Sequence, residues 1–71
     1  MIYSVMLASM EQGVPQGRVY TASIEECQYR VLQYIEAYNL VSSNWAGGEV
    51  YDGLGNVIGN ISYNGRFRPC E

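Results

Sequence analysis

The residues that could carry chemistry are few, and they form no catalytic set. The chain contains no His, which removes the commonest general base near neutral pH and the commonest metal ligand. Its two cysteines, Cys27 and Cys70, lie far apart in the sequence, and without a histidine they do not make a zinc site. A catalytic cysteine would also need a base. We therefore predict that the protein is not an enzyme and uses no cofactor or metal ion.

The segment Asp52-Gly53-Leu54-Gly55-Asn56 resembles a calcium-binding loop only superficially. Counted from Asp52, the twelfth position is Tyr63, where such a loop needs an acidic ligand. The glycines do not connect a strand to a helix and no Lys follows them, so they do not form a phosphate-binding loop. Because Gly, Asn and Asp tolerate positive φ, the segment predicts the loop of a β-hairpin.

The two cysteines allow two interpretations. Cys27 falls among apolar positions, where a free thiol behaves as a small hydrophobic side chain, and the absence of a secretory signal favours two unpaired thiols. The alternative is a Cys27–Cys70 disulfide that ties the C-terminal end to the helix. Such a bond would contribute about 3–4 kcal/mol by closing a long loop.

Polar and aromatic residues gather on one side of the segment 23–38. This first candidate surface consists of Glu25, Glu26, Tyr29, Gln33 and Glu36. It suits a basic protein partner, with Tyr29 as the anchor. The alternative is an ordinary solvated helix face that carries one aromatic side chain.

Arg66 and Arg68 form the only basic pair of the chain. They could make a weak contact to RNA or another anion, with bases stacked on Phe67 or Tyr63, or they could protect the edge of a sheet by their charge. The net charge of −3, with four arginines and no lysine against seven carboxylates, disfavours nucleic acid as a partner because phosphate neutralisation supplies most of that affinity.

The first candidate surface is positioned by the most clearly predicted element, a helix that begins after Ser23 and ends near Tyr38. Ser23 and Glu26 fit a capping box, and Glu25 and Glu26 complement the helix dipole. Asn39 suits a left-handed residue after the helix. Apolar residues recur at three- and four-residue spacing along one side: Ile24, Cys27, Val31, Tyr34, Ile35 and Tyr38.

The other elements are predicted to be strands. Alternation and turn residues place them at 2–8, 18–21, 49–51, 57–63 and 66–68. Asn64-Gly65 indicates a type I′ turn between the last two strands. We therefore predict a single domain over residues 1–71 with a two-layer α+β fold of ββαβββ order, in which a four- to five-stranded, mainly antiparallel sheet carries one helix on one face.

The first predicted strand is apolar on both sides. Tyr3, Val5 and Leu7 alternate with Ile2, Met6 and Ala8. Because one helix covers only one face, the other face would need a partner. The second candidate surface therefore comprises Ile2, Met6, Arg66 and Arg68, and burial of this face in a homodimer would supply a core that so short a chain lacks.

These observations lead to a ranked set of functional hypotheses. The first is a small acidic, non-enzymatic protein-binding module that acts by occluding a basic partner surface, such as a phage- or mobile-element-encoded inhibitor of host machinery of the anti-CRISPR kind. This hypothesis rests on the small size of the chain, its acidic charge and the predicted order of its helix and strands, and no motif identifies a family. The alternatives are a self-associating structural or accessory protein and a weak nucleic-acid or anion binder. No segment reaches the ~20 apolar residues of a membrane span or has a signal peptide's basic start, so we expect no membrane association and a cytoplasmic location, in the host if phage-encoded.

Overall fold

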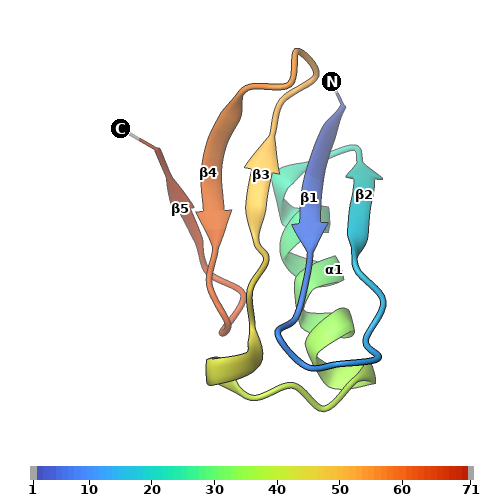
Figure 1. The fold of residues 1–71 in the computed structure, drawn as a ribbon. Helices are drawn as coiled ribbons and strands as arrows, with labels where there is room; N and C mark the ends of the chain where they lie inside the picture. Colours follow the sequence, from blue (N-terminus) through green and yellow to red (C-terminus); the bar gives the residue numbers. More distant parts are fainter. Residues whose placement is uncertain (1, 71) are drawn as a thin grey trace.

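The computed structural model describes residues 2–70 and shows one helix packed on one face of a five-stranded sheet (Figure 1). All strand pairs are antiparallel, and the strand order is β2-β1-β3-β4-β5. This confirms the predicted two-layer α+β fold of ββαβββ order. The elements are β1 (Tyr3–Leu7), β2 (Gly17–Thr21), α1 (Ile24–Ala37), a short 3-10 helix η1 (Ser42–Asn44), β3 (Glu49–Tyr51), β4 (Val57–Ile61) and β5 (Phe67–Pro69).

The ends of α1 follow local sequence signals. The Ser23 hydroxyl accepts a hydrogen bond from the Glu26 amide at 3.1 Å, which satisfies one of the free N–H groups of the first turn. The Glu26 carboxylate accepts the amide N–H of Ala22 at 2.9 Å, one residue earlier than a standard capping box requires. Asn39 has a φ of 52°, the left-handed conformation predicted for the residue that ends the helix.

The core lies between α1 and the facing side of the sheet. Cys27, Val31 and Tyr34 of the helix are buried together with inward side chains of the strands. The fully buried strand residues are Val5, Val50 and Ile61, one from each of β1, β3 and β4. Burial of these apolar side chains is the main stabilising contribution, and it fixes which side of every strand faces the helix.

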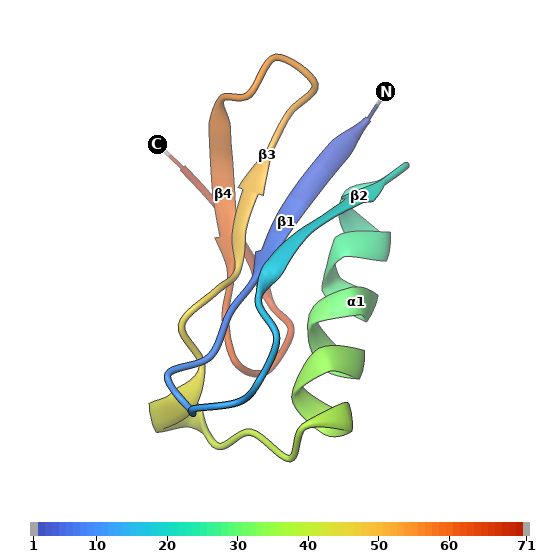
Figure 2. The same cartoon turned by 45° about the vertical axis from the view of Figure 1, so that its right-hand side comes forward.

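The other face of the sheet has no helix against it, as Figures 1 and 2 show. Ser4 and Met6 point to this side because they alternate with the buried Val5 and Leu7. β1 lies between β2 and β3, so the strand that is apolar on both sides is an interior strand of the sheet. The prediction that one of its faces lacks a covering element agrees with this arrangement.

The turn between β4 and β5 differs from the predicted type I′ turn. That type requires positive φ at both central residues, but of Asn64 and Gly65 only Gly65 has one, 84°. The Gly65 amide donates to the Ser62 carbonyl and the Ser62 amide to the Arg66 carbonyl, which makes a longer loop. The helix explains the difference. The Gln28 side-chain amide donates a hydrogen bond to the Gly65 carbonyl, and the Leu32 side chain lies 2.9 Å from the position that a Cβ on Gly65 would take.

Backbone segments approach each other closely just before β3. Gly48 donates a hydrogen bond to the carbonyl of Met6 and accepts one from the amide of Ile61, so it joins β1 and β4 across the sheet. Its φ is +106°, and a Cβ added to it would lie 2.1 Å from the Ile61 carbonyl oxygen. Only glycine fits this position without a shift of the backbone.

Candidate functional site

The uncovered face of the sheet is built from two rows of cross-strand neighbours. In one row Tyr20, Ser4 and Tyr51 lie side by side on β2, β1 and β3. In the next row Arg18 lies opposite Met6. Because residues two apart on a strand point to the same side, these side chains share one surface. We call the set Ile2, Ser4, Met6, Arg18, Tyr20 and Tyr51 the open-face cluster.

Arg18 spans the middle of this cluster. Its guanidinium carbon lies 4.4 Å from the centroid of the Tyr51 ring, within the range of a cation–π contact. Since β1 separates β2 from β3, the Arg18 side chain must pass over β1 to reach Tyr51. The contact limits the freedom of a long side chain, so the cation is held in place on an otherwise open surface.

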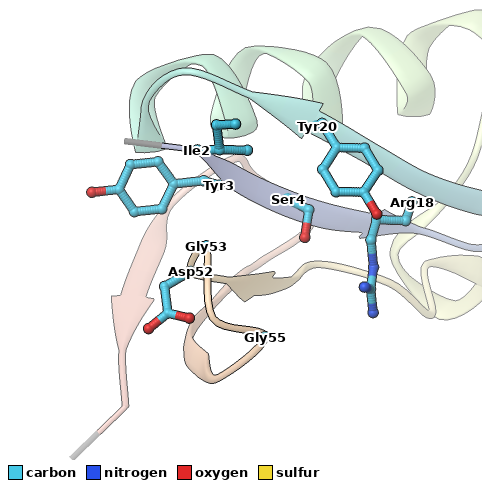
Figure 3. Close-up of a pocket in the computed structure, with 8 residues that line it drawn as sticks. All are labelled: Ile2, Tyr3, Ser4, Arg18, Tyr20, Asp52, Gly53 and Gly55. Atoms are coloured by element: carbon cyan, nitrogen blue, oxygen red, sulfur yellow. The ribbon is translucent and has the colours of Figure 1, made fainter.

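A hollow of about 600 Å³ lies beside the cluster, between β1, β2 and the loop that joins β3 to β4. In Figure 3 the Ser4 hydroxyl and the Arg18 side chain both point toward the side of that loop, where Gly53 and Gly55 lie. The volume is within the usual range of small-ligand sites. Ile2 and Tyr20 contribute apolar lining, although their side chains remain 62% and 67% exposed.

The loop that bounds the hollow is organised by Asp52. One of its carboxylate oxygens accepts the amides of Leu54 at 2.9 Å and Asn56 at 3.0 Å. These hydrogen bonds, the one from the Asn56 amide first, lower the pKa of the Asp52 carboxyl below its ordinary value, although desolvation opposes them. The loop is thus a hairpin loop, as predicted, and its carboxylate stays ionised at neutral pH.

The first candidate surface lies on the solvent side of α1. Tyr29 is 59% exposed, and its hydroxyl accepts a hydrogen bond of 2.9 Å from Gln33. Glu25 and Glu36 are exposed as well. Glu26 is half-buried and bonded to the Ala22 amide, so it belongs to the helix cap more than to a contact surface.

The fold places part of the second candidate surface on one side of the sheet. Ile2 and Met6 lie on the uncovered face, and the pairing of Arg68 with Asn60, which in turn pairs with Glu49, places Arg68 there too. Arg66 precedes β5 in the loop that joins β4 to β5, and it is exposed.

The side chains proposed for base stacking are placed differently. Phe67 packs against the core on the opposite side from Arg68. The hydroxyl of Tyr63 is bonded to the Leu40 carbonyl at 2.8 Å. The stacking expected beside Arg66 and Arg68 therefore has no support from Phe67, and the arginines fit charge protection of the β5 edge.

Both cysteines are free thiols, so the alternative prediction of a Cys27–Cys70 disulfide is wrong. Cys27 is buried under β2, where its sulfur lies 3.0 Å from the hydroxyl of Thr21. Cys70 follows β5, and the strand order puts β2 and β5 at opposite edges of the sheet. Within residues 2–70 no group of three or more His, Cys, Asp or Glu side chains could hold a metal ion.

We expect the two thiols to react at very different rates with a thiol-specific disulfide reagent at pH 8. Burial raises the pKa of the Cys27 thiol, the nearby Glu26 adds to the shift, and the hydrogen bond with Thr21 opposes it. Exposed Cys70 should therefore react at once, and Cys27 only when the protein unfolds. A Cys70→Ser variant isolates Cys27, and rapid labelling of that variant without denaturant would contradict its buried position.

Three members of the open-face cluster were not among the residues singled out from the sequence. Arg18, Tyr20 and Tyr51 alternate with inward residues on their own strands, but each strand is ordinary by itself. The only signal in the sequence was the general richness in Tyr and Arg. Arg18, Tyr20 and Tyr51 lie close together only because β3 pairs with β1.

No protein-family model, curated protein or solved structure matches the chain. No helix in the described part of the chain has both the length and the apolar character needed to cross a membrane.

Proposed function

We propose that the protein is a small binding module that docks onto another protein through the open face of its sheet and acts by occluding the surface it covers. The observation that carries this proposal is the composition of that face. Tyr20 and Ile2 are largely exposed, and Arg18 is held over Tyr51. Tyr and Arg dominate the energetics of protein interfaces because they combine large contact area with fixed polar groups.

The charge of this face indicates the partner's chemistry. Arg18 and Arg68 lie on it together with Glu49, which accepts a hydrogen bond from the Tyr51 hydroxyl, and Asp52 lines the hollow at its side. The contact therefore suits a partner segment that presents acidic and apolar side chains. The hypothesis of a basic partner concerned the helix face, whose charge has the opposite sign.

The helix face supports a second candidate, occlusion of a basic partner. Exposed Tyr29 lies there beside Glu25 and Glu36. The two candidates differ in the surface used, so surface variants separate them.

The test compares two matched sets of substitutions at exposed positions. The sheet variant combines Arg18→Glu with Tyr20→Ser, and the helix variant combines Glu36→Arg with Tyr29→Ser. A partner captured from the source cells by the unmodified protein is purified, and its affinity for each variant is measured by calorimetry. We expect at least a tenfold loss, about 1.4 kcal/mol, for the sheet variant and little change for the helix variant.

The opposite pattern would move the contact to the helix, and equal affinity of all three proteins would contradict both candidates. Sedimentation equilibrium of the unmodified protein tests whether it forms a homodimer. A dimer that the sheet variant dissociates would identify the occupant of the open face as a second copy instead.

A further inference from the structure

The hollow beside β1 is lined by a cation, Arg18, and by the side chain of Ser4. Arg18 contacts the Tyr51 ring, but within residues 2–70 no carboxylate lies close enough to form an ion pair with it. Ser4 is 3% exposed as a residue, and its side chain lines the hollow.

The register of the sheet explains why these two groups converge. Ser4 lies between Tyr20 and Tyr51 and forms the floor of the surface, because both neighbours have much larger side chains. Arg18 is the diagonal neighbour of Ser4 across the β1–β2 pair, a position within reach of a long side chain. A ligand atom above Ser4 would therefore also lie near the guanidinium.

The two ends of the hollow differ in charge. In Figure 3 Arg18 lies at one end and Asp52 at the other, with Ile2 and Tyr20 along the side between them. Asp52 is ionised and repels an anion from its end. An anionic group is therefore directed to Arg18, while an apolar group fits against Ile2 and Tyr20.

We propose that this hollow binds the carboxylate of a ligand that also carries an apolar or aromatic group, with Arg18 as the ionic partner and Ser4 as a hydrogen-bond donor. Arg pairs well with carboxylates because its planar fork offers parallel N–H donors. The inference rests on the proposed function, in which the partner protein supplies the carboxylate as an anchor of the interface. A free carboxylate has the same chemistry and serves as the probe.

The probe is 3-phenylpropanoate, titrated in a buffer without phosphate, with 3-phenylpropanamide as its neutral analogue. Binding is followed by amide chemical shifts in ¹H–¹⁵N spectra. We expect saturation in the millimolar range, with the shifts confined to β1, β2 and the loop 52–56. The amide should bind at least tenfold more weakly, about 1.4 kcal/mol, because it offers no charge to Arg18.

Two substitutions of the same type separate the site from the general charge of the face. Arg18→Gln should weaken binding of the probe about tenfold or more, and Arg68→Gln, on the same face but outside the hollow, should leave it unchanged. Ser4→Ala should weaken it about threefold, the range expected for one hydrogen bond. Equal binding of propanoate and amide, or equal loss in both arginine variants, would overturn the inference.

Failure of this inference and failure of the proposed function give different results. If Arg18→Gln binds the captured partner normally while the sheet variant does not, the open face binds protein without a carboxylate anchor. If the probe binds as expected but no partner depends on the open face, the hollow is a site for small carboxylates and the proposed function is wrong. Loss of both partner and probe in Arg18→Gln supports the two together.

Discussion

Replacing Gly48 with alanine is expected to destabilise the protein by about 3 kcal/mol or more, a large part of the total stability of about 4–10 kcal/mol for a domain of this size. Gly48 has a φ of +106°, and a Cβ there would lie 2.1 Å from the backbone oxygen of Ile61. The substitution therefore combines backbone strain with an overlap that a side-chain rotation cannot relieve. Urea unfolding followed by far-ultraviolet circular dichroism measures the loss.

Gly13 provides a matched control for the backbone strain alone. Its φ of +90° is similar, but nothing lies within 4 Å of the position of an added Cβ. Gly13→Ala should therefore cost only about 1–2 kcal/mol. If the two variants lose the same stability, the close approach between Gly48 and Ile61 does not constrain the fold as we infer.

The second large effect is expected for Ile61→Ala, with a loss of about 2–5 kcal/mol. Ile61 is fully buried between the sheet and α1, so the shorter side chain leaves a cavity that the surrounding core can fill only in part. Ile61→Val removes a single methylene group and should cost about 0.5–1.5 kcal/mol. Midpoints of urea unfolding for the two variants give the comparison.

Ile2 is the control for this prediction and connects stability with function. It is also an isoleucine, but it is 62% exposed on the open face. Ile2→Ala should change stability by less than about 0.5 kcal/mol while it weakens binding of the partner. A large loss of stability in Ile2→Ala would mean that this side chain supports the fold and is not free for contact.

The expected losses of stability differ between the two faces of the sheet because the domain has only two layers. One helix covers one face of the sheet, so the residues that hold the fold together, such as Val31 and Ile61, lie between the two layers. The opposite face contributes little to this core. Arg18 and Tyr20 can therefore vary with little cost in stability, which is the condition for a surface that serves binding.

Features of the fold that have local causes were predictable from the sequence. The helix is predictable because Ser23 and Glu26 hydrogen-bond backbone amides a few residues away, Asn39 tolerates the left-handed conformation that ends the helix, and the apolar residues repeat within each turn. The strand order along the chain and the single uncovered face followed from alternation and from the presence of only one helix. The type of the turn at Asn64-Gly65 was not predictable in this way, because this turn also contacts Gln28 and Leu32 of the helix.

The side chains of the open face are brought together by the pairing of strands that are distant in the sequence. Tyr51 reaches Arg18 because β3, from a distant part of the chain, pairs with β1 on the side that β2 leaves free. The register of that pairing also puts Ser4 between two tyrosines. Pairing between distant strands depends on the packing of the whole core. No local pattern in the sequence of β1, β2 or β3 therefore predicts which strands pair.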